Sequence, residues 1–182
     1  GSTEFDPDLK IKFEGWRTQN LSSALQKIPA KEINIRDANI SMLTNDFGGL
    51  TFKTDLQAKH IGDGIDLQFN ITSDQRLLNF VANGTGRIQN NILTSEIEME
   101  RGKFDWQKKQ IKASRMHGKA QYQFGNDDYK YTGEIQIGGM HLLGLAWQNV
   151  AATVEKNQDY MKLIAGGKSV GIQGLELGLD IE

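Results

Sequence analysis

The chain has 182 residues, with 21 lysines and arginines against 23 aspartates and glutamates, a formal net charge of -2 and no cysteine. Because both signs of charge are interleaved along the predicted strands and no contiguous basic block occurs, the composition argues against nucleic acid as a partner. The lack of cysteine excludes a disulfide framework and thiolate metal sites. The chain contains no run of roughly 18 apolar residues, the length that would predict a membrane span. Its length fits one domain.

The first residues combine a short remnant with the start of a strand. Gly1–Phe5 is typical of a cloning remnant, and residues 6–182 are expected to form a single segment of a longer protein. Leu9, Ile11 and Phe13 alternate with charged residues. This alternation predicts a first strand.

One short helix is predicted near residues 20–27. Asn20 or Ser22 can cap its beginning, the apolar residues that follow have helical spacing, and Pro29 ends it. No other segment of the chain favours a helix.

The clearest pattern in the chain is the stretch Lys31–Ala58. It contains two long alternating strands that are joined by an Asp-Phe-Gly-Gly turn. The apolar phase shifts at Arg36-Asp37, which predicts a β-bulge. Since apolar and polar residues alternate after the turn, the hairpin has one apolar face and one polar face.

Most of the remaining chain repeats this alternation. Asp74–Ala82 fits either a helical turn or a strand, and a strand with a connecting turn is favoured. Asn90-Asn91 predicts a turn, Gly102 a break, and Gly166-Gly167 a further turn. The pattern predicts about a dozen short strands in an antiparallel meander, and therefore an all-β fold.

No group of residues predicts catalysis, a metal site or a cofactor. His60, His117 and His141 lie on different predicted strands, without a second ligand at metal spacing. The carboxylates of residues 96–100 alternate onto the polar face of a strand, where charge is expected in any case. We therefore expect no enzyme activity, no metal and no cofactor.

The function then depends on what the apolar face contacts. Antiparallel strands with almost no helix to cover them can close into a barrel, fold into two facing sheets or bind a ligand. The alternation alone leaves these three possibilities open.

Several stretches carry a resemblance to a known family. They are Ile28-Pro29 with the Ile-x-Ile-x-x-Ala-x-Ile strand Ile33–Ile40, Gly-Leu-Thr-Phe at Gly49–Phe52, Asp-Leu-Gln-Ala at Asp55–Ala58, the stretch Gly144–Ala152, and Gly166-Gly167. In these features the chain resembles the AsmA-like group of bacterial envelope proteins. That group includes the TamB-, YhdP- and YdbH-like bridge proteins, of which the YdbH-like subgroup is preferred.

The resemblance implies an elongated, mostly antiparallel sheet that is folded into an open gutter, or β-taco, with an apolar interior. It implies a segment of a periplasm-spanning lipid-transfer bridge, tethered to the inner membrane through parts outside this sequence. The apolar groove would carry phospholipid acyl chains, or those of another lipid, between the inner and outer membranes, with other envelope proteins as partners. The competing interpretation is a non-enzymatic β-sandwich, a glycan-binding or structural adhesin module whose apolar face is ordinary core.

The candidate lipid-groove residues share the apolar parity of their strands. They are Ile40, Leu50, Phe52, Leu56, Leu67, Phe69, Ile97, Met99, Ile135 and Ile137. Because a register error of one residue turns a whole strand over, their common orientation is a sharp test of the pattern.

Both ends of the chain carry an uninterrupted alternation, at Leu9–Phe13 and at Leu175–Ile181. We expect these strands to be cut edges of a longer sheet that pair with further strands in the whole protein. In the isolated fragment, unpaired edges favour edge-to-edge self-association.

Overall fold

The computed structural model describes residues 3–4, 31–44, 48–125, 128–142, 144–157, 159–173 and 175–181. The strand predicted at Leu9–Phe13 and the helix predicted near residues 20–27 lie outside the described residues.

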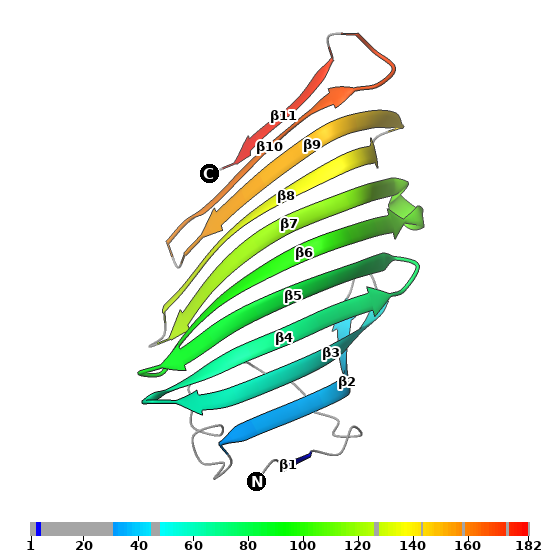
Figure 1. The fold of residues 1–182 in the computed structure, drawn as a ribbon. Coiled ribbons are helices and arrows are strands. Elements are labelled where there is room, and N and C mark those ends of the chain that lie inside the picture. The colour runs from blue at the N-terminus through cyan, green and yellow to red at the C-terminus, as the bar shows by residue number, and fades with distance from the viewer. Residues whose placement is uncertain are drawn as a thin grey trace.

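The described residues form one 11-stranded sheet in which every strand lies beside its neighbours in sequence (Figure 1). The strands are β1 (Thr3–Glu4), β2 (Glu32–Thr44), β3 (Gly48–Ile61), β4 (Gly64–Asp74), β5 (Leu78–Gln89), β6 (Ile92–Trp106), β7 (Ile111–Gly125), β8 (Asp128–Leu142), β9 (Leu145–Lys156), β10 (Met161–Ser169) and β11 (Glu176–Ile181). A single 3-10 turn, η1 (Gln107–Lys109), connects β6 to β7. Strand β1 pairs with β2 in parallel, and all later pairs are antiparallel.

The sheet is open. Among the described residues β1 pairs only with β2, and β11 pairs only with β10. Figure 1 shows these two strands at opposite ends of the molecule. The predicted all-β, mostly antiparallel open gutter is therefore confirmed, and the described residues contain no second sheet that could complete a sandwich.

The described strands are longer than the sequence predicted, with nine to fifteen residues in each of β2 to β10. The predicted break at Gly102 is wrong, because β6 runs through it and Met99 packs there: a Cβ added to Gly102 would lie 2.8 Å from the Met99 sulfur. The predicted turn at Gly166-Gly167 is also wrong. Both glycines lie inside β10, where the register shifts. A glycine inside a strand thus marks a bulge or a close contact here rather than an end.

The bulge predicted at Arg36-Asp37 is confirmed. The register of β2 against β3 shifts between Ile35 and Ala38, and Asp37 has a φ of 52°. Arg115 and Asn149 have similar positive φ values inside β7 and β9. Because a bulge inserts one residue, it keeps the apolar residues before and after it on the same face.

Two further predictions from the sequence are resolved by the backbone. Strand β5 begins at Leu78, so Asp74–Ala82 forms the end of one strand, a turn and the start of the next. Asn90 and Asn91 have φ values of 52° and 63° and form the predicted turn between β5 and β6. Two consecutive positive φ angles are the requirement of a type I′ hairpin turn, which Asn tolerates.

The register lines up apolar residues in rows that cross the sheet. One row of directly paired residues runs from β2 to β11 through Ile35, Leu56, Phe69, Gly84, Ile97, Ala120, Gly133, Val154, Leu163 and Ile181. Directly opposed residues point to the same side of a sheet. This row and the residues of the same parity on each strand are termed the apolar face, and the other side is the outer face.

The most buried part of the apolar face lies near the N-terminal end of the sheet. Its members are Ile33, Ala58, Ile65, Leu67 and Ile88, with Ile35, Leu56 and Leu93 packed against them. Burial of such side chains supplies the main driving force for folding.

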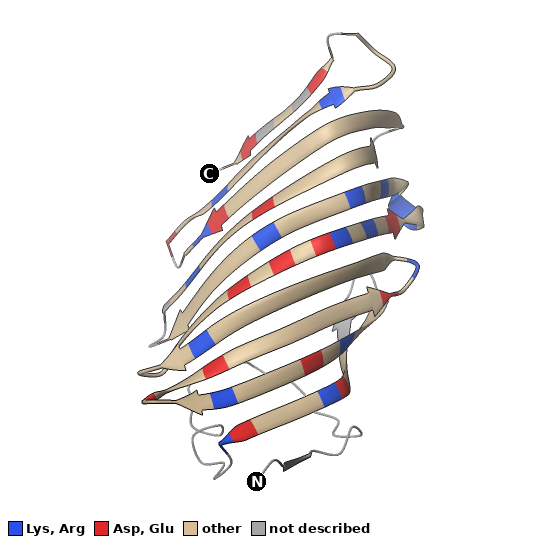
Figure 2. Ribbon diagram, in the orientation of Figure 1, with Lys and Arg blue, Asp and Glu red and all other residues tan. Residues whose placement is uncertain are grey.

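On the outer face, amide and charged side chains form hydrogen bonds and ion pairs between neighbouring strands. Gln57 Nε2 donates hydrogen bonds to Glu32 Oε1 at 2.8 Å and Asn34 Oδ1 at 3.2 Å. Asn70 Nδ2 donates to Asn83 Oδ1 at 2.8 Å on the next strand. Figure 2 shows both signs of charge spread over the strands. Such cross-strand pairs fix the register from the solvent side.

Candidate functional site

All ten candidate groove residues belong to the apolar face. Leu56 pairs with Phe69, and Ile40 pairs with Phe52. Leu50 lies two residues before Phe52 on β3, and Leu67 lies two residues before Phe69 on β4. Met99 and Ile135 pair with the same residue of β7, and Ile97 and Ile137 lie two residues from them. The common orientation that the alternation predicted therefore agrees with the register of the sheet.

Burial differs among these ten residues. Leu50 and Leu67 are 6% and 8% exposed, whereas the other eight are half-buried. A half-buried apolar side chain on an open sheet keeps surface available for a further contact. The half-buried candidates extend from Ile40 on β2 to Ile137 on β8, so the candidate surface runs along the sheet and is not confined to one end of it.

A hollow of about 250 Å³ lies in the apolar face over β6 to β10. The apolar residues that line it are Ile97, Met99, Gly118, Ala120, Gly133, Ile135, Ala152, Val154 and Leu163. The hollow exists because large side chains on β6 and β8 stand beside Gly118, Ala120 and Ala152 on the neighbouring strands. Three candidate residues, Ile97, Met99 and Ile135, come together in it.

Sequence reasoning missed the small residues of this hollow. Ala120, Gly133 and Ala152 give a weak alternation signal because alanine and glycine occur on either face of a strand. Only the register shows that Ala120 lies opposite Ile97, that Ala152 lies opposite Ile135, and that Gly133 lies between Ala120 and Val154. The signal that could have found them is a small residue at an inward position whose neighbour on the adjacent strand is isoleucine or valine.

The apolar face is bounded by two margins, where the hairpin turns lie. The tyrosine margin carries Tyr122, Phe124, Tyr129 and Tyr131, whose rings form successive pairs with centroids 6.0 to 6.3 Å apart. Lys156 Nζ lies 5.7 Å from the Tyr129 ring. Burial, and to a lesser extent the neighbouring Tyr131, raises the pKa of Tyr122 above its ordinary value of 10.0. Tyr122 is therefore a neutral, partly buried wall residue at physiological pH.

The tryptophan margin lies at the other end of the strands. Phe52 and Phe80 have centroids 6.0 Å apart, and Phe104 meets Trp106 edge to face at 6.5 Å. Trp147 on β9 is 6% exposed. Aromatic rings thus stand at both ends of the strands, while small residues occupy the middle.

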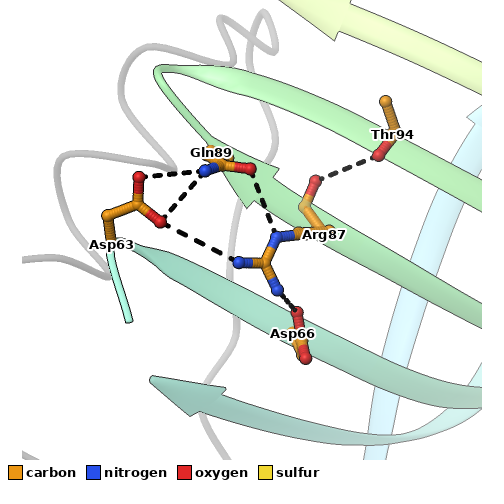
Figure 3. Close-up of polar contacts among 5 residues, drawn as sticks. All are labelled: Asp63, Asp66, Arg87, Gln89 and Thr94. Carbon is orange, nitrogen blue, oxygen red and sulfur yellow. Dashed lines mark hydrogen bonds and ion pairs between the residues drawn. The ribbon is translucent and has the colours of Figure 1, made fainter. Parts of the chain in front are cut away.

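The polar network in Figure 3 lies at the tyrosine margin on the outer face. Arg87 Nη1 donates to Asp66 Oδ1 at 2.6 Å, and Gln89 Nε2 donates to both carboxylate oxygens of Asp63. The hydrogen bond from Gln89 is the main cause that lowers the pKa of Asp63, and the positive charge of Arg87 lowers it further. Thr94 Oγ1 donates a hydrogen bond to the Arg87 carbonyl oxygen at 3.4 Å. These partners satisfy one another, so the network joins β4, β5 and β6 and offers no reactive group.

His60, His117 and His141 lie on β3, β7 and β8. Within the described ranges, no three His, Asp or Glu side chains gather closely enough to hold a metal ion. In the same part of the chain no helix has the length and apolar character needed to cross a membrane.

No family model, curated protein or solved structure matches this chain. The geometry of the apolar face therefore carries the functional argument.

Proposed function

We propose that this chain is a segment of a lipid-transfer bridge, whose apolar face carries the acyl chains of phospholipid or a similar lipid. The supporting observation is a row of paired, mostly apolar residues that continues across ten strands of an open sheet. An apolar surface of this extent is unusual for a protein without a ligand or a partner.

The physical chemistry of the hollow suits a mobile acyl chain. Each methylene that leaves water contributes about 0.8 kcal/mol, whichever apolar atoms it meets. The apolar side chains that line the hollow, including Ile97, Ile135 and Leu163, are hydrocarbon, and the Met99 sulfur is at most a weak hydrogen-bond acceptor. A chain held by nondirectional contacts alone can slide along the rows, because no contact fixes its position.

The resemblance to the AsmA-like group supports the same proposal and adds a location. In this proposal the segment lies in the periplasm, is tethered to the inner membrane by other parts of the protein and acts without catalysis. Its apolar surface passes lipid between the inner and outer membranes, with further envelope proteins as partners. The competing sandwich module needs a second sheet to cover the apolar face, whereas the described residues form a single one.

The test compares lipid that copurifies with the native protein and with two aspartate variants. Ile97→Asp places a carboxylate in the hollow, and Ile164→Asp makes the same change on the outer face of β10, where Ile164 is 43% exposed. Mass spectrometry of organic extracts is expected to find phospholipid with the native protein and Ile164→Asp but not with Ile97→Asp. A β-rich circular dichroism spectrum is expected for all three, because the face is open to water at position 97.

Two outcomes would overturn the proposal. One is the absence of any acyl lipid from extracts of the native protein purified without detergent. The other is unfolding of Ile97→Asp alone, since a buried carboxylate without a partner destabilises a closed core severely. Unfolding would favour ordinary core packing over a groove.

A further inference from the structure

The hairpin that joins β6 to β7 is the most strongly charged part of the chain. Residues 101–115 contain six lysines and arginines and one acid, Asp105, although the whole chain has a net charge of -2. Figure 2 shows basic residues gathered at this turn. All six basic side chains are exposed.

Most of these cations lack an acidic partner. Lys112 Nζ lies 3.5 Å from Asp105 Oδ2, and Arg115 donates to the carbonyl oxygen of Gly138. No ion pair within the described residues involves Arg101, Lys103, Lys108 or Lys109. Residues 101–115 are termed the basic hairpin. Their positive field is therefore largely uncompensated.

The other side of the same hairpin belongs to the apolar face. Phe104 and Trp106 alternate with Lys103 and Asp105 along β6, and their rings lie at the tryptophan margin. Lys109 Nζ lies 6.0 Å from the centre of the Trp106 ring. An ammonium group and an amphipathic ring thus meet where the apolar face reaches solvent. This is the arrangement that a lipid needs at its boundary between tail and headgroup.

The tyrosine margin has a different charge. That margin also carries cations on its strands, Lys156 beside Tyr129 and Arg87 in the outer-face network. The connecting segments alone are opposite in charge: residues 62–63, 90–91, 126–127 and 157–160 contain three aspartates and no lysine or arginine, whereas residues 107–110 contain two lysines and no acid. On the tryptophan margin the neighbouring turn adds Arg76 close in sequence to Asp74, which leaves the basic hairpin as the dominant charge. The two margins would therefore treat an anionic group in opposite ways.

From this asymmetry we infer that the basic hairpin binds the anionic headgroup of a lipid whose acyl chains lie on the adjoining apolar face. The inference rests on the proposed function and makes it more specific. The segment prefers anionic phospholipid to zwitterionic phospholipid, and it orients the headgroup toward the tryptophan margin.

The expected strength follows from the exposure of the lysines. One exposed pair of opposite charges changes affinity by a factor of roughly two to five. Because the Debye length is about 8 Å at physiological salt, the preference is largest at low salt and shrinks as salt is added. Several lysines acting on one phosphate are needed for a clear effect.

The experiment measures binding of phosphatidylglycerol and phosphatidylcholine that carry identical chains with the same fluorophore in one tail. The test variant is the triple substitution Lys103→Gln, Lys108→Gln and Lys109→Gln. The control makes the same change in charge with Lys59→Gln, Lys119→Gln and Lys130→Gln, three exposed lysines on the outer face away from this hairpin.

We expect the test variant to lose roughly tenfold in affinity for phosphatidylglycerol and less than about twofold for phosphatidylcholine. The control is expected to change both affinities by less than about twofold. Equal losses for the two lipids, or equal losses in the test and control variants, would overturn the inference. If the native protein binds neither lipid, the proposed function itself fails, which is a distinguishable result.

Two further probes identify the source of the phosphate group. Glycerol 3-phosphate, which has the charge without the chains, is expected to compete weakly, because the apolar face supplies most of the affinity. Competition as strong as that of the intact lipid would indicate a site for free phosphate and overturn the inference. Binding of the native protein to phosphatidylglycerol vesicles without uptake of the labelled lipid would indicate docking on a membrane surface, and would also overturn it.

Discussion

The ring of Phe69 on β4 lies over Gly84 on β5, its directly paired neighbour. A Cβ atom added to Gly84 would lie 2.3 Å from two ring atoms and 2.9 Å from the carbonyl oxygen of Glu96. The glycine therefore provides the space that the ring occupies. Phe69 fills the gap in the apolar row that Gly84 leaves.

Gly84→Ala is expected to destabilise the protein by about 1–3 kcal/mol, because the added methyl group overpacks the contact with Phe69. Gly178→Ala on β11 is the matched control, since a Cβ there meets nothing within 4 Å. Urea denaturation followed by circular dichroism measures both. Equal stability of the two variants would show that Phe69 leaves its position without cost.

Filling the hollow tests its role without adding charge. Ala152 lines the hollow, whereas its neighbour Ala151 is exposed on the outer face. Ala152→Phe is expected to reduce copurifying lipid several-fold by occupying the space of an acyl chain, while Ala151→Phe leaves it unchanged. Mass spectrometry against a lipid standard measures the difference. An equal effect from both variants would mean that the hollow is not where lipid binds.

Tyr122 predicts how stability depends on pH. Burial raises its pKa above 10.0 in the folded state, so the folded protein retains this proton at pH values where the unfolded chain has lost it. Stability therefore falls as pH rises above about 10. Tyr122→Phe is expected to show a smaller fall between about pH 9 and pH 11 in denaturation experiments. If the native protein and the variant decline equally, Tyr122 is not the group responsible.

The sequence predicted the elements in which one strong physical signal was present. Strict alternation placed Phe52, Phe69 and Met99 on one face, because strand parity admits only two orientations. The phase shift at Arg36-Asp37 predicted a bulge that the register of β2 confirms. The all-β pattern left one apolar face uncovered, and the family resemblance then favoured an open sheet over a barrel or a sandwich.

Features that depend on contacts between neighbouring strands could not be predicted from the sequence. Gly102 and Gly167 signal a turn when each is considered alone, yet in the sheet they accommodate Met99 and Val150. The hollow could not be predicted for the same reason, since its alanines leave a space only because Ile97 and Ile135 lie beside them on the neighbouring strands. The charge of residues 101–115 was visible in the sequence, but its position at one margin of the apolar face required the register of β6 and β7.

The C-terminal end of the sheet combines an unpaired edge with exposed apolar side chains. Strand β11 has β10 as its one neighbour among the described residues. Six large hydrophobic residues that are at least 42% exposed lie in this region: Tyr160, Met161, Ile164, Val170, Ile172 and Ile181. An open strand edge beside such a surface recruits another strand, because pairing satisfies the backbone and removes apolar area from water.

We therefore expect the protein to associate edge to edge through β11 as its concentration rises. The substitutions Val170→Lys, Ile172→Lys and Ile181→Lys together are expected to weaken this association at least tenfold, since roughly 1.4 kcal/mol of lost apolar burial and charge repulsion suffices. Ile61→Lys is the control, because Ile61 is 49% exposed at the end of β3. Sedimentation velocity over a range of concentrations measures the effect. A native protein that sediments as a monomer throughout, or a control that dissociates equally, would contradict an interface at β11.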